Sequence, residues 1–354
     1  SHEKGVTSTP ADLIDMAIRN AGDDRRVAIS ITDHNNVRAT PVALQYIEGN
    51  NLQSKVDYVS GAEFNSGTKS LGKFTYEGKR KAIYGSMHLL GYGFDHNDEE
   101  IVAFSDLREL HVGGSNVGDQ ICAGRNIIKQ ETGIDVPFKY LARLIPKAKN
   151  GVDVYSSFIS LVKNYAALQG ETLKEGLIMS ILGPYFNADL KHNDLAIGKA
   201  KLDIQDLSHM IKNAGGICVL AHPTFLTYKQ KTILHDVNLL DEFIYTLNQK
   251  EKLVDGMEFF YPSMSNFKEF PQFYELAIKH DLFLSAGSDY HGFAEKYPRV
   301  IGKVFDVQID NQLLESHILS FETIYAVLPD GTIYQAPRTD ALPKAVRLDS
   351  QDNG

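Results

Sequence analysis

Short apolar strand patterns alternate with amphipathic helix patterns at both ends of this 354-residue chain, and no other feature constrains its fold as strongly. The first helix pattern begins at Thr9-Pro10 and stops at Gly22, and the strand pattern of residues 27–32 follows it. Repeated strand-then-helix order is typical of α/β proteins with a parallel sheet, either open or closed into a barrel. In both forms the carboxyl ends of the strands share one face, so we expect functional side chains to gather there.

Further elements are predicted on both sides of a helical middle region. They are strands over residues 56–60, 87–92, 217–221, 254–261 and 282–286, and helices over residues 41–48, 204–214 and 267–280. Between residues 107 and 203 the pattern is helical and contains no convincing strand, which predicts a helical insertion. Residues 309–354 form a predicted C-terminal extension, with a hairpin around Pro329-Asp330-Gly331 and a polar, disordered tail.

The composition excludes several classes of protein. The 36 Lys and Arg residues against 45 Asp and Glu residues give a net charge of −9, which argues against a large nucleic-acid surface. Cys122 and Cys218 are too few for a disulfide framework or a cysteine zinc site, so we expect a reducing, cytoplasmic compartment. No run approaches the ~20 apolar residues of a membrane span. The first residues, SHEKGVTSTP, do not resemble a signal peptide.

Side chains that bind metals stand at the ends of the predicted elements. In VAISITDHNN, Asp33 and His34 directly follow the first strand; the others are Glu63, His88, His222, Asp289 and His291, with His2 ahead of the first helix. Imidazole and carboxylate donors together suit Zn, Mn or Fe. One carboxylate such as Glu63 can bridge two ions, and paired ions lower the pKa of a water and hold the oxygens of an in-line displacement.

Each of these residues also has an ordinary structural interpretation. A single His at a strand end, such as His88 or His222, more often makes a hydrogen bond than binds a metal. Asp33 can simply cap a turn, and Glu63 after Gly61-Ala62 can be an exposed loop carboxylate. Asp289 and His291 are a better pair, because residues i and i+2 of an extended segment face the same side. The metal-site hypothesis therefore depends on the joint occurrence of these residues.

Seven stretches of the chain resemble the PHP superfamily, metal-dependent phosphoesterases named for polymerase and histidinol phosphatase domains. They are, in the family's order, TPADLIDMA, AISITDHNN, GAEF, HLLGYGFD, AHPTF, DGMEFFYPS and AGSDYHG. The resemblance covers roughly the first 95 residues and about 205 to 305. It implies an α/β fold, a distorted (β/α)7 barrel in two parts, residues 1–106 and 204–308, with a helical insertion lobe over residues 107–203 and the extension 309–354.

The resemblance also implies a site for two or three divalent metal ions, with Mn, Zn and Fe as the candidates. The matching ligand positions are His2, His34, Glu63, His88, His222, Asp289 and His291, with Glu63 as the bridging ligand. Asp33 matches a position that orients a ligand or a metal-bound water. The family opens with a His-x-His pair; His2 matches its second member, and the first is expected just before Ser1. Glu3 is the only carboxylate in the region where the family has a further ligand before the first helix.

We therefore predict hydrolysis of a small phosphomonoester or a short phosphodiester by a hydroxide that bridges the metal ions. The helical middle region resembles the insertion of a subgroup that acts on nucleotides or short oligonucleotides, so a nucleotide-like substrate is favoured. The predicted catalytic residues are Asp33, Glu63 and His222. The predicted contacts to substrate phosphate are Arg299, Arg125 and Lys129, for which solvated surface charge is the competing interpretation.

Two other functions fit the same residues. An amidohydrolase-like metal hydrolase would act on C–N bonds, because His-rich sites at the strand ends of barrels also serve that chemistry. A non-catalytic metal-binding or regulatory module fits the incomplete His-x-His start.

Overall fold

The computed structural model describes most of the chain as far as residue 287. The described residues are 8–21, 26–66, 74–76, 79–81, 87–183, 200–223, 226–228, 231–277 without 261–274, 279–287, 318–320, 324–327, 333–336 and 344–346. Four predicted site residues lie outside them: His2, Asp289, His291 and Arg299. The chain divides into two compact units, the first made of Ser1–His96 with Leu207–Gly354 and the second of Asn97–Asp206. The division into barrel, insertion and extension stays a prediction.

The first unit holds all the larger strands. Before the second unit it contains α1 (Pro10–Ala21), β1 (Val27–Ile29), α2 (Ala39–Gly49), β2 (Val56–Tyr58), β3 (Gly61–Ser66), β4 (Phe74–Tyr76), β5 (Lys79–Lys81) and β6 (Met87–Tyr92). The helix α10 (Ile204–Asn213) spans the boundary between the units. The remaining elements are β9 (Ile217–Leu220), β10 (Thr227–Tyr228), β11 (Lys231–Thr232), η2 (Ile233–His235), α11 (Val237–Tyr245), η3 (Thr246–Lys250), β12 (Gly256–Phe260), β13 (Phe283–Ala286), β14 (Ile318–Ser320), β15 (Ile324–Val327), β16 (Ile333–Ala336) and β17 (Lys344–Val346).

A seven-stranded mixed sheet dominates this unit, in the order β17-β14-β13-β12-β9-β6-β3. The strands β9, β12, β13 and β14 run parallel, whereas β6 is antiparallel to both β3 and β9, and β17 is antiparallel to β14. Strands β1 and β2 form a separate parallel pair. The described residues do not show closure into a barrel. The architecture is therefore a mixed α/β fold, and the barrel stays a prediction.

The expectation of a parallel sheet was wrong at β6, which runs antiparallel to both of its neighbours. A chain that turns back without a helical crossover returns antiparallel, whereas parallel neighbours need a crossover such as α11 between β9 and β12. Between β3 and β6 the described elements are the short antiparallel strands β4 and β5, with no helix. As a result His88, the second residue of β6, lies at the amino end of its strand rather than at the carboxyl end.

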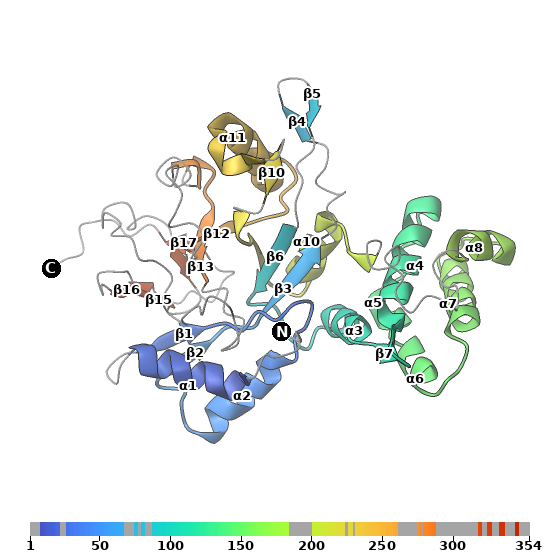
Figure 1. Cartoon of the computed structure of the whole chain (residues 1–354), viewed down its shortest axis with the longest axis horizontal. Coiled ribbons are helices and arrows are strands. Elements are labelled where there is room, and N and C mark those ends of the chain that lie inside the picture. The colour runs from blue at the N-terminus through green and yellow to red at the C-terminus, as the bar shows by residue number, and fades with distance from the viewer. Residues whose placement is uncertain are drawn as a thin grey trace. The chain divides into compact units, whose positions relative to one another are not determined.

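Two helices cover the parallel pair β1–β2 (Figure 1). Helix α1 starts where the sequence predicts: the Thr9 Oγ1 atom accepts a hydrogen bond from the Asp12 N–H at 3.2 Å, and the Asp12 carboxylate accepts one from the Thr9 N–H at 2.7 Å. These two bonds satisfy groups that a helix leaves without partners at its first turn. The apolar faces of α1 and α2 then pack with the strands in one cluster, which consists of Ile14, Ile31, Ala39, Ala43, Ile47 and Val56.

Gly61 brings the segment after β1 close to β3. A Cβ atom at this position would lie 2.0 Å from the Ser30 Oγ atom and 3.0 Å from the Thr32 Cγ2 atom. Only glycine therefore lets the two segments approach to this distance. The approach matters because Asp33 and His34 follow directly.

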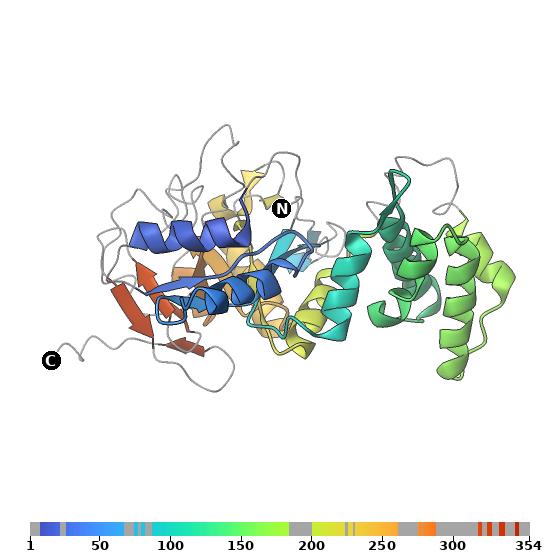
Figure 2. The ribbon, with the colours of Figure 1, turned by 90° about the horizontal axis from the view of Figure 1, so that it is seen from below.

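The second unit is mainly helical. It contains α3 (Glu99–Arg108), β7 (His111–Val112), β8 (Ser115–Asn116), α4 (Val117–Thr132), α5 (Phe138–Leu141), α6 (Leu144–Lys149), α7 (Val154–Leu168) and α8 (Glu175–Leu182). Its green helices α4, α7 and α8 lie side by side in both views (Figure 1, Figure 2). The short hairpin β7–β8 is the one departure, among its described residues, from the expected absence of strands. None of the described helices has the length and apolar character that crossing a membrane requires.

Candidate metal centre

Backbone hydrogen bonds on both sides of His34 hold it against β3. The Glu63 N–H donates to the Asp33 carbonyl at 3.0 Å, and the Asn35 N–H donates to the Glu63 carbonyl at 2.7 Å. Asn35 has a φ of 50°, a left-handed conformation that asparagine adopts more readily than most residues. Its side-chain oxygen also accepts a hydrogen bond from the Asn65 N–H at 3.1 Å. The turn in VAISITDHNN therefore fixes the His34 backbone beside Glu63.

The antiparallel strand β6 brings His88 to the same place. Its register pairs His88 with Asn65 of β3, two residues beyond Glu63. On the other side, the Ala221 N–H donates to the His88 carbonyl at 3.0 Å, directly after β9 ends. The amino end of β6 thus lies beside the carboxyl end of β9, and His222 is the next residue after Ala221.

Three predicted ligands, all histidines, converge on the carboxylate of a fourth, Glu63. The His222 Nε2 atom lies 3.1 Å from the Glu63 Oε1 atom and 3.2 Å from the His88 Nδ1 atom. The His88 Nδ1 atom also contacts Glu63 Oε1, and the His34 Nδ1 atom lies 3.8 Å from Glu63 Oε2. The His88 ring meets the other two edge to face, with centroids 5.4 Å from His34 and 4.9 Å from His222.

The cluster is buried on one side and open on the other. The His222 and Glu63 side chains are 9% and 10% exposed, whereas His34 is 32% exposed. Burial raises the pKa of the Glu63 carboxyl, but hydrogen bonds from His222 and His88, with the positive charge of His34, outweigh it. The net pKa of Glu63 is well below its usual range. This carboxylate is therefore a buried anion, and His34 is the more exposed residue beside it.

The donor set fits a divalent metal ion. His34, Glu63 and His88 each offer one ligand atom, and these three atoms lie within 4.8 Å of one another. The His222 Nε2 atom adds a further nitrogen beside the same carboxylate oxygen. Imidazole nitrogen and carboxylate oxygen are the ligands of Zn, Mn and Fe sites. The number and identity of the ions stay predictions, as do the ligand roles of His2, Asp289 and His291.

Asp33 joins the centre through its backbone. Its carbonyl accepts the Glu63 N–H, and its half-buried side chain lies close enough to Tyr58 to act on that phenol. Burial is the main cause that raises the pKa of Tyr58 to about 12, and the charge of Asp33 adds to it. The predicted role of the Asp33 side chain in orienting a ligand stays a prediction.

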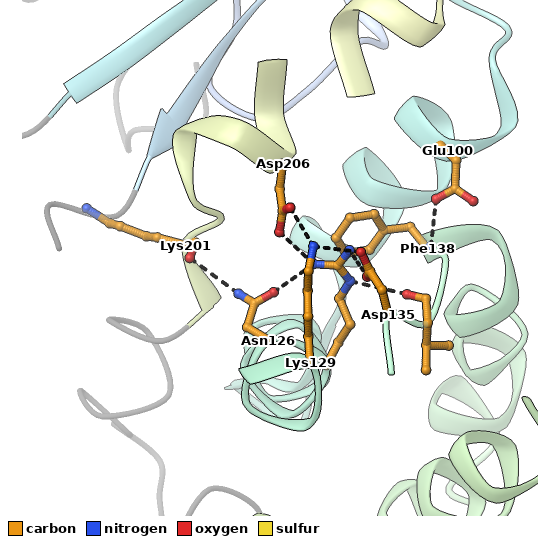
Figure 3. A network of polar contacts seen from close by, with 9 residues as sticks. Glu100, Asn126, Lys129, Asp135, Phe138, Lys201 and Asp206 are labelled. Carbon is orange, nitrogen blue, oxygen red and sulfur yellow. Dashed lines mark hydrogen bonds and ion pairs between the residues drawn. The ribbon is translucent and has the colours of Figure 1, made fainter. Parts of the chain in front are cut away.

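Lys129 belongs to an ion-pair network within the second unit (Figure 3). Arg125 belongs to the same network. The Arg125 guanidinium contacts Asp135 and, at 3.2 Å, Asp206, and its Cζ atom lies 4.6 Å from the centre of the Phe138 ring. The Lys129 Nζ atom lies 2.6 Å from both Asp135 and Asp206. Two cations thus face two carboxylates. A contact of Arg125 or Lys129 with substrate stays a prediction.

Sequence reasoning missed Glu258, a buried carboxylate behind His222. Its Oε2 atom accepts a hydrogen bond from the His222 N–H at 2.7 Å, and the residue is only 4% exposed. The available signal was a single charged residue inside an otherwise apolar strand, Gly256–Phe260. Such a residue needs a partner, because burying an unpaired charge is costly.

Comparisons with known proteins give weak likenesses. Residues 304–354 match a family model described as bacterial type VI secretion (VasE, ImpJ, EvfL), and this short C-terminal match does not show which family the chain belongs to. No curated protein matches the chain.

Two solved structures are similar to the chain. One is an amidohydrolase from Chromobacterium violaceum with bound sulfate and no metal, at 17% identity and a TM-score of 0.43, covering 83% of this chain and 86% of that one. The other is a candidate metal-dependent phosphoesterase from Bifidobacterium adolescentis, at 17% identity and a TM-score of 0.42, covering 87% of this chain and 90% of that one. At this low identity and low TM-score, neither likeness decides what this chain does.

Proposed function

We propose that this chain is a metal-dependent hydrolase that cleaves a small phosphomonoester or a short phosphodiester. One observation carries the proposal: three imidazoles from separate parts of the chain, those of His34, His88 and His222, surround the buried Glu63 carboxylate. Burying polar and charged groups costs free energy unless they are paired or coordinate a metal, and such clusters with a shifted pKa are typical of functional sites.

The roles that we propose for these residues follow from how exposed each side chain is. Glu63, His88 and His222 are the more buried members and would hold the ion, with Glu63 supplying the negative charge. A divalent ion held there supplies positive charge to a phosphoryl oxygen and lowers the pKa of a bound water. His34, the most exposed member at 32%, borders the side from which a substrate would enter. Asp33 is the proposed group for orienting the ligands.

The finer features of the proposal rest on the sequence motifs. TDH, AHP and GSDYH together support a PHP-type barrel, two or three ions and phosphate-ester specificity. An anionic substrate suits an acidic chain only if bound cations supply local positive charge, as ions at this centre would. A nucleotide-like substrate and a cytoplasmic location are part of the same proposal.

An amidohydrolase-like activity on C–N bonds is the second candidate. The nitrogen-rich donor set favours it as well, because three imidazoles accompany one carboxylate. A metal ion at such a site polarises a carbonyl oxygen as readily as a phosphoryl oxygen.

The test combines metal content with turnover on defined substrates. Purified chain would be analysed for metal per chain, then assayed with Mn²⁺ or Zn²⁺ on p-nitrophenyl phosphate, nucleotides, short oligonucleotides and simple amides. We expect at least one ion per chain and hydrolysis of a phosphate ester. Glu63→Gln should reduce turnover roughly a hundredfold or more, since losing even an indirect contact to a metal costs 10–100-fold. Glu48→Gln, at an exposed position of α2, is the matched control.

Each contrary result has a distinct meaning. Turnover of amides alone selects the second candidate. Bound metal without turnover of any substrate indicates a non-catalytic metal-binding module. Full activity of Glu63→Gln contradicts the proposal outright.

A further inference from the structure

Glu258 contacts the candidate centre through the backbone of His222. The carboxylate lies on β12, is 4% exposed, and accepts the His222 N–H at 2.7 Å. We propose that Glu258 is a positioning residue: it holds the His222 backbone so that the imidazole meets Glu63, and it does not itself bind the metal. This inference rests on the proposed function, because the consequence for metal binding requires a metal at the centre.

The hydrogen bond to Glu258 lies just beyond the last backbone pair between β9 and β12. The register pairs Val219 with Gly256 and Leu220 with Met257, and no further pair follows. The next N–H, that of Ala221, donates to the His88 carbonyl instead. The N–H of His222 then donates to the Glu258 side chain. A side chain on the neighbouring strand thus replaces the backbone acceptor that a longer β9 would have had.

The His222 backbone needs such a restraint because its conformation is unfavourable. Its φ is 27°, a value that side-chain-bearing residues rarely adopt. The next residue is Pro223, which restricts the preceding backbone further. Conformations of this kind persist where the surrounding structure holds them in place. Without the acceptor, a buried N–H would lose its partner and the backbone would relax.

The other oxygen of Glu258 is enclosed as well. A Cβ atom on Gly287 would lie 2.1 Å from the Glu258 Oε1 atom, so the glycine leaves the space that this oxygen occupies. One carboxylate oxygen therefore receives the His222 N–H while the other is fixed against Gly287. This enclosure keeps Oε2 aimed at His222, which is what a positioning role requires.

The strand β9 offers a matched control at its opposite end. There the Asp255 Oδ2 atom accepts the Cys218 N–H at 2.8 Å. The bond is of the same kind and lies on the same strand, but Cys218 precedes His222 by four residues and has no part in the centre. The Asp255 carboxylate also contacts the Lys212 Nζ atom at 2.8 Å, so removing it measures the structural cost of losing both polar contacts at a position away from His222.

The experiment compares Glu258→Met, Glu258→Gln and Asp255→Ala with the wild-type chain. Met keeps the approximate length of Glu but offers no oxygen, whereas Gln keeps a carbonyl oxygen that can accept the His222 N–H. Mn²⁺ affinity would be measured by titration calorimetry, and hydrogen exchange of the His222 amide by NMR. Urea unfolding of each variant separates a loss of affinity from a loss of fold.

We expect Glu258→Met to weaken Mn²⁺ binding 10–100-fold, the usual effect of losing a residue that supports a ligand. Its His222 amide should exchange at least roughly tenfold faster. Glu258→Gln should stay within about threefold of the wild type in both measurements, because the acceptor remains. Asp255→Ala should be less stable but should bind Mn²⁺ within about threefold of the wild type, because its site is separate.

Three results would overturn the inference. One is unchanged affinity and exchange in Glu258→Met. Another is a loss in Glu258→Gln as large as in Glu258→Met, which would mean that the charge rather than the acceptor matters. The third is an equal loss of affinity in Asp255→Ala. If the wild-type chain binds neither Mn²⁺ nor Zn²⁺, the proposed function fails, and the exchange of the His222 amide alone decides whether Glu258 holds the backbone.

Discussion

The Nε2 atom of His222 lies 3.1 Å from the Oε1 atom of Glu63, although 159 positions separate the two residues in the chain. The contact depends on the antiparallel strand β6, which joins β3 to β9 and carries His88 between them. The candidate centre is thus assembled by sheet topology rather than by a local sequence motif.

Asn35 should be needed for the position of His34. Asn35→Ala removes the acceptor of the Asn65 N–H and places alanine at a φ of 50°. We expect a loss of about 1–3 kcal/mol in the free energy of unfolding, because a left-handed alanine is strained and a bond is lost. Asn35→Gly, which tolerates the φ, should lose less. Urea unfolding of both variants checks this, and equal losses would mean that the φ is unimportant.

Gly61 should be intolerant of a side chain because of Ser30. Gly61→Ala places a Cβ atom 2.0 Å from the Ser30 Oγ atom, and we expect a loss of about 1–3 kcal/mol from overpacking. Adding Ser30→Ala removes that oxygen and should recover part of the loss. A double-mutant cycle by urea unfolding measures the coupling, and strictly additive effects would show that the two residues do not meet.

Gly287→Ala should reproduce the effect of losing the Glu258 acceptor. Its Cβ atom would displace Glu258 Oε1 and, through the rigid carboxylate, move Oε2 away from the His222 N–H. We expect faster hydrogen exchange of the His222 amide in this variant. Adding Glu258→Met should cause no further increase, because both changes break the same bond. If the exchange rates of the two changes add, Gly287 does not act through the bond between the His222 N–H and Glu258.

Asp206 should make the stability of the second unit depend on pH. Burial raises the pKa of this carboxyl, but the hydrogen bond from Lys129 and the charges of Lys129 and Arg125 outweigh it, so the folded-state pKa is lowered. A lowered pKa contributes stability above the unfolded value of about 3.9, and this contribution is lost as the pH falls through the folded value. Asp206→Asn should therefore flatten the fall in unfolding free energy below about pH 4.

Urea unfolding of wild type and Asp206→Asn between about pH 3 and about pH 7 measures this dependence. Glu171→Gln, an exposed position of the same unit, serves as the control. At neutral pH the Asp206→Asn variant should be less stable by about 1–3 kcal/mol, because buried Arg125 loses one of its two carboxylate partners but keeps Asp135. If the wild type and Asp206→Asn lose unfolding free energy equally at acid pH, Asp206 is not the source of the pH dependence.

Local signals predicted several elements well. Thr9-Pro10 and Asp12 correctly predicted the start of helix α1, which runs from Pro10 to Ala21. This was possible because capping groups act within one turn of the helix. The apolar run at Ile217 predicted β9, which ends one residue earlier than expected, at Leu220. Strands β15 and β16 pair antiparallel on either side of the expected turn at Pro329-Asp330-Gly331. Strand β17, at residues 344–346, lies in the tail for which disorder was expected.

Features set by distant pairing could not be read locally. Glu63 was expected after a strand, yet it lies within β3, because pairing with β6 makes a strand of a Gly-Ala-Glu segment with little strand preference of its own. The direction of β6 was missed for the same reason. The positive φ of Asn35 and His222 and the bond from His222 to Glu258 depend on neighbours from other segments. Grouping His34, Glu63, His88 and His222 was nevertheless possible from their places at predicted element ends.

Crystals soaked in Mn²⁺ or Zn²⁺ and measured at the metal's absorption edge would test the central claim most directly. The account predicts an anomalous peak in bonding contact with the Glu63 carboxylate and with at least one of His34, His88 and His222. An anomalous map with no peak beside Glu63, or with the metal held only elsewhere on the chain, would contradict it.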